Sequence, residues 1–374
     1  MPDKIPIAAA HKPALIGCSL AEMEALFAPF AQPPYRARQV YKWVHRRQAQ
    51  SFEEMSNVPK TFRRELETHF SLNSLKLAAK DISADGTQKY LWELQDGKRI
   101  ESVFIPEESR TTVCISSQVG CAMACDFCAT GQMGFLKNLT PGEIVEQVIR
   151  LQQNTGRNIT NVVLMGMGEP FLNYPRVIQA GKILCDPEGL AIAAKKITIS
   201  TVGVIPRIYQ FADEGQPFSL AISLHAPTQE LRRQIMPVAE PFPLDELMKS
   251  ARYYTHKSRK RITFEYVLLE GVNDSPAEAR ALKKLLSPLR CKLNLIPYND
   301  AGVGFRAPSE ERILKFAAEV ESASFAVMLR KNRGNDIAAA CGQLYVKAKE
   351  REKPRFIFSL RLIVTIFLYS LSVV

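Results

Sequence analysis

Four cysteines lie close together in the segment VCISSQVGCAMACDFCAT, residues 113–130. They are Cys114, Cys121, Cys125 and Cys128, and the last three follow the spacing C-x3-C-x2-C after a strand-like run. A structural zinc ion takes four ligands, usually from two separated pairs, and the sequence has no second Cys or His pair at finger spacing. Three thiolates on one loop suit a [4Fe–4S] cluster in which one iron stays open to substrate or cofactor. A chance cluster, or a zinc site completed by Cys114 or a distant residue, is the alternative.

The bulk composition is that of a soluble globular protein with a full hydrophobic core. The chain has 374 residues, of which 46% are hydrophobic and 23% are charged, so it has room for one large domain and one small one. A chain of this length needs no disulfide staples, and its start, MPDKIPIAAA, lacks the apolar run of a secretory signal. We therefore expect a cytoplasmic protein, in which clustered cysteines indicate metal or redox chemistry.

The charge balance favours a polyanionic partner, because the formal net charge is +11 and nucleic acid is the commonest polyanion that basic proteins bind. Candidate phosphate contacts lie in a basic and aromatic run near the N-terminus, in HKSRKR at 256–261 and in RKNR at 330–333. The basic members of the first run are Arg36, Arg38, Lys42, Arg46 and Arg47, and Tyr35, Tyr41 and Trp43 lie between them. A solvated helix face or loop is the alternative for each run.

An apolar tail departs from this soluble pattern. Residues 356–374, FIFSLRLIVTIFLYSLSVV, are nearly all apolar and follow the basic stretch KAKEREKPR. A segment of this length can just span a bilayer as a helix. The segment is also rich in β-branched residues, and an atypical terminus or a tail from an altered reading frame fits as well. Since nothing else in the chain suggests a membrane, we treat residues 350–374 as a tail of unknown role.

Two structured regions precede the tail. Residues 1–85 predict a small, basic helical module with apolar residues at helical spacing. Residues 86–349 begin with strand-like runs on both sides of Asp96-Gly97, a strong hairpin signal. From residue 113 onward strand-like runs alternate with helical ones, and TPGE at 140–143 and SPAE at 275–278 each provide a hydroxyl N-cap, Pro and Glu. This alternation predicts an α/β fold with parallel strands in a barrel or a doubly wound sheet.

The cysteine spacing, with Phe127 directly before the last cysteine, resembles the signature of the radical S-adenosylmethionine (SAM) superfamily. The resemblance implies a partial (β/α)6 barrel with the cluster loop after the first strand. It also implies that the open iron binds SAM, and that the reduced cluster cleaves SAM to a 5′-deoxyadenosyl radical. The metal ligands would be Cys121, Cys125 and Cys128.

Four further motifs resemble one family within that superfamily, the RlmN/Cfr family of RNA methyltransferases. They are GMGEP at 166–170, SLHAP at 223–227, NLIPYN at 294–299 and RGNDIAAACGQL at 333–344. The resemblance extends from the N-terminal module to about residue 347 and ends before the tail. Each motif is weak alone, but together they are specific.

The family methylates an adenine carbon that is too electrophilic for direct transfer from SAM, and it uses two cysteines outside the cluster. Cys341 matches the cysteine that accepts a methyl group from a first SAM, before a second SAM supplies the radical. Cys114 matches the cysteine that resolves the protein–RNA adduct through a transient disulfide with Cys341. Glu101 matches the proton acceptor. From the residues alone, Cys341 reads as a small buried thiol, and Glu101 as a strand residue facing either the cluster loop or solvent.

The resemblance also implies a set of SAM contacts. A glycine allows close backbone approach and a carboxylate or carbonyl accepts hydrogen bonds from an ammonium group, which suits Gly168 and Glu169. Barrel sites gather at the carboxyl ends of strands, where ITIS and SLH place their polar residues. His225 alone would more often be a core histidine. The remaining expected contacts are Ser200, Ser223, Leu224, His225 and Asn299.

The sequence therefore predicts a monomeric cytoplasmic radical SAM enzyme that methylates carbon 2 of adenosine in RNA. The resemblance implies 23S rRNA near the peptidyl-transferase centre and tRNA beside the anticodon as substrates, one [4Fe–4S] cluster, two SAM per turnover, and an electron donor such as flavodoxin or ferredoxin. One alternative is methylation of carbon 8 of the same rRNA adenine. A non-catalytic iron–sulfur or zinc RNA-binding protein is another, but it would need neither Cys114 nor Cys341.

Overall fold

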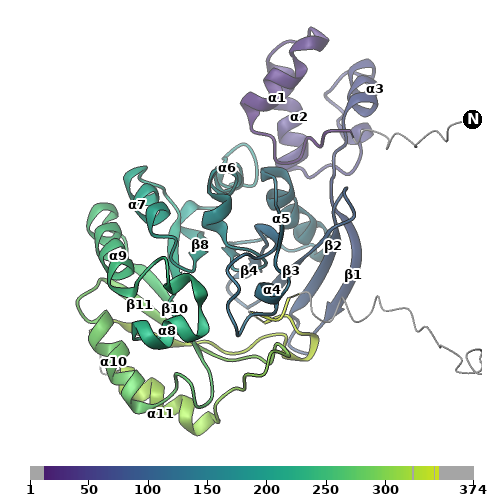
Figure 1. The fold of residues 1–374 in the computed structure, drawn as a ribbon. Helices are drawn as coiled ribbons and strands as arrows, with labels where there is room; N and C mark the ends of the chain where they lie inside the picture. The colour runs from purple at the N-terminus through teal and green to yellow at the C-terminus, as the bar shows by residue number, and fades with distance from the viewer. Residues whose placement is uncertain (1–11, 322–323, 341, 345–374) are drawn as a thin grey trace, which may run out of the picture.

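The computed structural model describes residues 12–321, 324–340 and 342–344. A ten-stranded sheet with the order β1-β2-β3-β4-β7-β8-β9-β10-β11-β12 forms the centre, and helices cover its outer side (Figure 1). Two further strands pair with each other beside it. The strands are β1 Lys76–Ile82, β2 Gln88–Glu93, β3 Arg99–Pro106, β4 Thr111–Cys114, β5 Gln118–Gly120, β6 Phe135–Asn138, β7 Asn161–Leu164, β8 Ile197–Thr201, β9 Ser219–Ser223, β10 Ile262–Leu268, β11 Cys291–Pro297 and β12 Ala326–Leu329.

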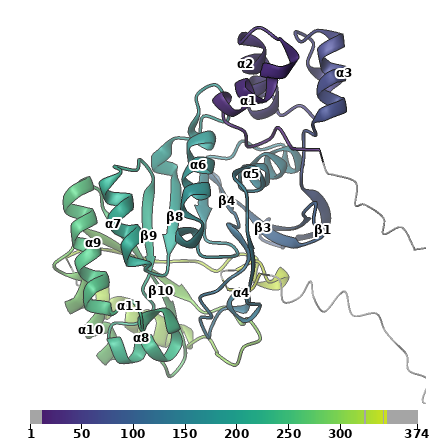
Figure 2. The same cartoon turned by 45° about the horizontal axis from the view of Figure 1, so that its top comes forward.

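The first helices precede the sheet, and the later ones connect its parallel strands. They are α1 Leu20–Phe27, α2 Tyr35–Tyr41, α3 Lys60–His69, α4 Ala129–Gln132, α5 Pro141–Thr155, α6 Tyr174–Cys185, α7 Ile205–Asp213, α8 Gln229–Ile235, α9 Leu244–Ser258, α10 Pro276–Leu286 and α11 Glu310–Glu321. The strands from β4 through β12 in the large sheet pair in parallel. Because parallel neighbours need a crossover, each pair is joined by a helical connection. This arrangement confirms the α/β expectation (Figure 2).

The two predicted capping motifs begin helices. Thr140 and Glu143 form a reciprocal capping box at the start of α5, with Pro141 in the first turn. Ser275 accepts hydrogen bonds from two backbone N–H groups at the start of α10. Both caps satisfy N–H groups that have no partner inside the helix, so the helices begin at these residues.

An antiparallel extension widens the parallel sheet on one side. β2 and β3 form the hairpin predicted around Asp96-Gly97, and Gly97 adopts φ +75° in the turn. β1 pairs with β2, although its residues, 76–82, lie within the range that the sequence suggested for the helical module. The extension therefore continues from β1 to β4 and brings the predicted Glu101 beside the parallel strands.

The N-terminal module packs around its own aromatic residues. Phe27 contacts the rings of Phe62 and Phe70, with ring centroids 5.4 and 5.8 Å apart. His45 lies in the π-helical segment η2, Lys42–Arg46, and its Nε2 accepts the Gly17 N–H at 3.0 Å. Burial lowers the pKa of His45 to about 4, so this ring stays neutral and holds the module together as an acceptor.

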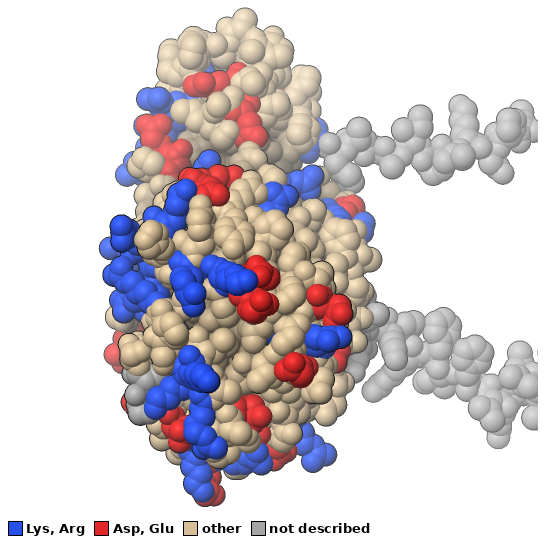
Figure 3. Space-filling model, turned by 60° about the vertical axis from the view of Figure 1, so that its left-hand side comes forward, with Lys and Arg blue, Asp and Glu red and all other residues tan. Residues whose placement is uncertain are grey.

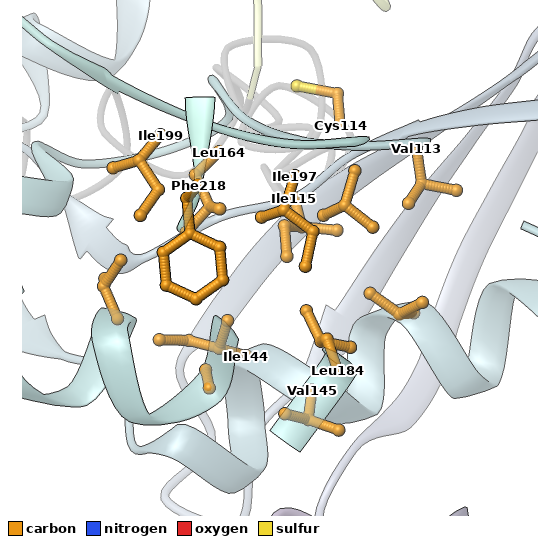
Figure 4. Close-up of a cluster of buried hydrophobic side chains, with 14 of the residues drawn as sticks. Val113, Cys114, Ile115, Ile144, Val145, Leu164, Leu184, Ile197, Ile199 and Phe218 are labelled. Carbon is orange, nitrogen blue, oxygen red and sulfur yellow. The ribbon is translucent and has the colours of Figure 1, made fainter. Parts of the chain in front are cut away.

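Alternation along β4 separates the core from the site. Val113 in β4 and Ile115 just after it project into an apolar cluster with residues of α5, α6 and β8, whereas the Cys114 side chain leaves the other face of the strand at the edge of the same cluster (Figure 4). Because successive strand residues point to opposite faces, the same short strand supplies the core and a candidate catalytic thiol.

Candidate active site

A cavity lies at the carboxyl ends of the parallel strands, beside the cysteine loop. Residues at or just beyond the ends of β7, β8, β9, β10 and β11 line it. Nine of the predicted site residues border this one cavity: Cys121, Cys125, Cys128, Gly168, Glu169, Ser200, Ser223, His225 and Asn299. Segments that are far apart in the sequence therefore meet where barrel sites usually form.

The three spaced cysteines carry the clearest chemical signal of the cavity. Burial raises the pKa of the Cys121 thiol to about 12 and raises that of Cys125 well above its ordinary value, and neighbouring thiolates and Glu169 act in the same direction. In the described part of the chain, no three His, Cys, Asp or Glu side chains converge closely enough to hold one metal ion. A [4Fe–4S] cluster does not need such convergence, because each thiolate binds a different iron. Three thiols around one cavity fit that group.

Gly168 and Glu169 form part of the wall of the same cavity. Gly168 has φ +98°, and a Cβ there would lie 2.5 Å from Gln118 Cβ, so a side chain has no room. Both oxygens of Glu169 accept backbone hydrogen bonds, from the N–H of Phe171 at 2.9 Å and of Val202 at 2.8 Å. Burial raises the pKa of Glu169 to about 7 despite these bonds. Each oxygen has a second lone pair, so the group can still accept from a ligand.

His225 is held as a neutral ring. Its Nδ1 accepts the Val267 N–H at 3.0 Å, so the proton resides on Nε2. Burial lowers the pKa of His225 to about 3, which excludes an acid–base role near neutral pH. The ring meets Phe127 of the cysteine loop edge to face, with centroids 5.0 Å apart. His225 therefore braces the cysteine loop against the end of β9.

The other predicted SAM contacts differ in what they offer the cavity. Ser200 and Ser223 place their hydroxyl oxygens 3.5 Å apart at the ends of β8 and β9. Leu224 is fully buried outside the cavity lining, and its N–H donates to the Glu265 carbonyl. Asn299 Oδ1 is buried with no hydrogen-bond partner among the described residues, which leaves an acceptor for a ligand donor.

Sequence reasoning missed two buried charged residues at this site. Glu265 lies in the middle of β10 and lines the cavity, and its Oε2 is buried without a partner in the described part of the chain. Burial raises its pKa. The glutamate inside the apolar run ITFEYVLL was the only available signal. Arg232 in α8 is fully buried, donates to the carbonyls of Val202, Leu224 and Phe242, and is close enough to Cys125 to affect the pKa of its thiol.

Neither Cys114 nor Glu101 lines this cavity. Cys114 lines an adjoining cavity that shares Met165, Ile296, Asn299 and Leu344 with the first. Strand pairing places Val103 opposite Cys114, and Glu101, two residues before Val103, therefore shares its face of the sheet. The two side chains thus project to one side of neighbouring strands.

The expected methyl carrier, Cys341, lies outside the described residues. Its neighbours in sequence approach both cavities, since Ala340 lines the cavity of Cys114 and Gly342 lines that of the cluster cysteines. The Gly342 carbonyl also accepts the Ala129 N–H at 2.7 Å, directly after Cys128. The C-terminal segment therefore passes between the two parts of the site.

Comparison with known proteins agrees with this geometry. The model of the radical SAM superfamily matches residues 115–282, and that of the ribosomal RNA large subunit methyltransferase N-terminal domain matches residues 14–72. The chain is 44% identical over 329 residues to the dual-specificity RNA methyltransferase RlmN of Syntrophobacter fumaroxidans, covering 87% of this chain and 96% of that one. The chain belongs to the RlmN family of radical SAM RNA methyltransferases. The RlmN protein of Geobacter sulfurreducens is 45% identical, with coverage of 88% and 91%.

A solved member of the same superfamily has the same fold over nearly its whole length. The crystal structure of a radical SAM methyltransferase from Sphaerobacter thermophilus matches with a TM-score of 0.86 and 44% identity, covering 89% of this chain and 99% of that one. Membership in the radical SAM superfamily implies a [4Fe–4S] cluster and SAM, and the cavity fits both. No helix in the described ranges combines the length and apolarity needed to cross a membrane, and residues 356–374 lie outside those ranges.

Proposed function

We propose that this enzyme methylates carbon 2 of adenosine in 23S rRNA, near the peptidyl-transferase centre, and in tRNA, beside the anticodon. The observation that carries the proposal is the junction of two cavities, one bordered by the cluster cysteines and Gly342 and the other by Cys114 and Ala340. RlmN relatives named for dual-specificity RNA methylation support the substrate class.

The site divides the chemistry between bound groups and residues of the chain. When bound, the cluster and two SAM molecules per turnover would supply the methyl group, the radical and an acceptor for one electron. Cys341 carries the methyl carbon, which loses one hydrogen atom to the radical and then adds to carbon 2 of the adenine. The resulting adduct loses one electron, and Glu101 accepts the proton that leaves carbon 2. Cys114 sulfur then attacks Cys341 sulfur, a disulfide forms, and the released carbon takes a proton to become the methyl group. An external reductant such as flavodoxin or ferredoxin supplies electrons.

Basic residues beside the two cavities support an RNA substrate. The run 330–333 lines the cavity of Cys114. A second basic and aromatic cavity lies on the N-terminal module, lined by Tyr35, Arg38, Gln39, Lys42, Trp43, Arg47 and Asn57. Tyr41, which the sequence placed among the basic residues of this run, is fully buried, so its side chain is not accessible to RNA. Lys and Arg side chains also continue down one edge of the face shown in Figure 3, from the N-terminal module to the far end. Such a surface binds phosphates, and the target base must leave its stack to reach the site.

The test is product analysis after anaerobic cluster reconstitution. Wild type, Cys341→Ala and Cys114→Ala proteins are incubated with SAM, a reductant and unmodified 23S rRNA or tRNA, and the nucleosides are read by mass and retention. We expect 2-methyladenosine from the wild type, none from Cys341→Ala, and a trapped protein–RNA adduct from Cys114→Ala. Cys18→Ala, a thiol in the N-terminal module, is the matched control and should retain activity.

The same experiment separates the alternatives. An 8-methyladenosine product would move the enzyme to carbon 8 chemistry. SAM cleavage without any methylated adenosine would show that the substrate assignment is wrong. A product that survives Cys341→Ala would contradict the methyl-carrier role.

A further inference from the structure

A buried lysine lies at the centre of the face that carries Glu101. Lys89, in β2, is 4% exposed, and its Nζ is 3.5 Å from Glu101 Oε1 and 3.9 Å from Asp81 Oδ2. The same ammonium donates to the carbonyl oxygen of Ala338 at 3.4 Å. Lys89 therefore contacts the expected proton acceptor and the segment that leads to Cys341.

Strand register explains why these groups meet. Asp81 in β1 pairs with Lys89, Lys89 pairs with Val103 in β3, and Val103 pairs with Cys114 in β4. Directly paired residues point to the same side of a sheet, so this row extends across four strands on one face. Glu101, two residues from Val103, points to that face as well.

Burial of the Lys89 ammonium carries a desolvation cost that a role in stability alone does not explain. Burying an ammonium and a carboxylate together carries a desolvation cost that often cancels their attraction, and an apolar pair of similar size can be equally stable. Lysine normally reaches solvent with its charged end. Lys89 in β2 instead directs its ammonium to Glu101 in the neighbouring strand β3. This direction indicates that the positive charge has a functional role.

The C-terminal segment is fastened to the same hairpin at several points. Asp85, in the turn between β1 and β2, accepts the Gly334 N–H at 3.1 Å, and Asp336 accepts the Ala84 N–H at 3.2 Å. Ala338 adopts φ +50°, which is uncommon for a residue with a side chain, and presents its carbonyl to Lys89. The position of this segment therefore depends on the β1–β2 hairpin and on Lys89.

We propose that Lys89 is a positioning residue that fixes the Glu101 carboxylate beside Cys114 and ties it to the segment leading to Cys341. This inference rests on the proposed function, in which Glu101 accepts the adenine proton. A positive charge at this distance favours the ionised carboxylate, the form that can accept a proton. Asp81 opposes that effect by sharing the same ammonium.

Two substitutions move the pH dependence in opposite directions. Lys89→Met removes the ammonium and leaves the Glu101 carboxylate buried without it. The acid limb, which is the pH range over which the single-turnover methylation rate falls on the acidic side, should therefore shift to higher pH by about one to two units. Asp81→Asn leaves the ammonium to Glu101, so the limb should move to lower pH. Lys89→Arg keeps the charge and should stay close to the wild type.

The experiment follows 2-methyladenosine formation by wild type and variants between about pH 6 and pH 9. Protein–RNA adduct, methylation of Cys341 and SAM cleavage are measured in the same samples. For Lys89→Met we expect adduct to accumulate near neutral pH while Cys341 methylation and SAM cleavage stay at wild-type levels. Lys137→Met is the matched control, because Lys137 also bridges two carboxylates, but these are Asp96 and Glu143 rather than Glu101 and Asp81.

An acid limb that stays in place in both Lys89→Met and Asp81→Asn would overturn the inference. If Lys89→Met does not fold, Asp81→Asn alone decides, because Asp81 is partly exposed at the sheet edge. Wild type that makes no methylated adenosine would instead contradict the proposed function. An equal shift in Lys137→Met would show that the effect is not specific to Lys89.

Discussion

At the scale of single residues, burial sets the charge state of the polar groups around the cavity. His225 and Glu169 are both buried, and burial moves their pKa values in opposite directions, to about 3 and about 7. In each case burial favours the neutral form. The histidine is therefore neutral at every physiological pH, whereas the carboxyl of Glu169 changes charge close to neutrality.

Glu169 should make stability depend on pH. Its folded pKa of about 7 lies above the ordinary value of 4.5, so its contribution to stability is fully present below about pH 4.5 and is lost as pH rises through 7. Between these two pH values the free energy of unfolding of the wild type should fall by about 3 kcal/mol more than that of Glu169→Gln, whose side chain does not titrate. Urea unfolding of the two cluster-free proteins across this pH range measures the difference.

Parallel free-energy curves for the two proteins would contradict a raised pKa at Glu169. Glu22→Gln is a suitable control. Its carboxylate also accepts backbone and side-chain hydrogen bonds, but its pKa is lowered, so its contribution to stability is lost as pH falls.

At the scale of structural elements, the turns after the strands shape the site. Gly168 follows β7, has positive φ, and faces both the side chain and the backbone N of Gln118 at less than 3 Å from a Cβ position. Gly156, the C-cap of α5, also has positive φ but has no neighbour within 4 Å of that position. A side chain at Gly156 would therefore meet backbone strain alone, whereas a side chain at Gly168 would meet backbone strain and a steric clash.

Alanine substitutions at the two glycines should therefore lower the free energy of unfolding by different amounts. Gly156→Ala should cost about 1 kcal/mol of unfolding free energy through its left-handed backbone. Gly168→Ala should cost about 3 kcal/mol, because it adds a clash that displaces the β5 backbone, and it should weaken SAM binding. Urea unfolding and equilibrium dialysis with SAM check both. Equal costs and normal SAM binding in both variants would contradict the close approach at Gly168.

The loop after β10 depends on one buried amide. Asn273 donates from Nδ2 to the carbonyls of His225 and Val267 at 2.8 and 2.7 Å, and its Oδ1 accepts the Leu269 N–H at 2.7 Å. Asn273→Ala should cost about 3 kcal/mol, roughly 1 kcal/mol for each lost bond. It should also loosen His225 and lower cluster retention, measured by iron content after gel filtration.

Asn154→Ala is the matched control for this prediction. Asn154 donates a single hydrogen bond, to the Arg150 carbonyl on the exposed side of α5, so its loss should change the free energy of unfolding by less than about 1 kcal/mol. A similar loss in the two variants would show that Asn273 does not organise the loop.

Local patterns could be read from the sequence because their residues are neighbours in the chain. The two predicted caps begin helices, and the cysteine loop and GMGEP border one cavity, while their roles as cluster ligands and SAM contacts stay predictions. Lys89, Glu265 and Arg232 could not be predicted in this way, because a charged residue in a strand or helix reads the same whether it faces solvent or a cavity. Only register and tertiary packing decide the direction, as at Lys89, whose partners come from positions 81, 101 and 338.

At the scale of the whole molecule, we predict that the small N-terminal module and the barrel bind one RNA together. Glu188, just after α6, forms ion pairs with Arg38 and Lys42 of the module, which holds the module's basic cavity against the barrel. In that cavity the Arg47 guanidinium lies 4.3 Å from the centroid of the Trp43 ring. Stacked cationic and aromatic groups of this kind bind a phosphate beside an unstacked base.

Arg47→Gln should therefore weaken RNA binding without changing the chemistry. Loss of one phosphate contact should reduce the slope of log affinity against log salt by about 0.7 to 0.9, because fewer counterions are released on binding. RNA affinity measured over a range of salt concentrations checks the slope, and SAM cleavage in the absence of RNA should stay unchanged. Lys315→Gln is the control, because Lys315 also carries a positive charge but pairs with Glu311 on α11. If both variants bind RNA with the wild-type slope, RNA approaches the site over the barrel alone, and the positive charge of the module serves another purpose.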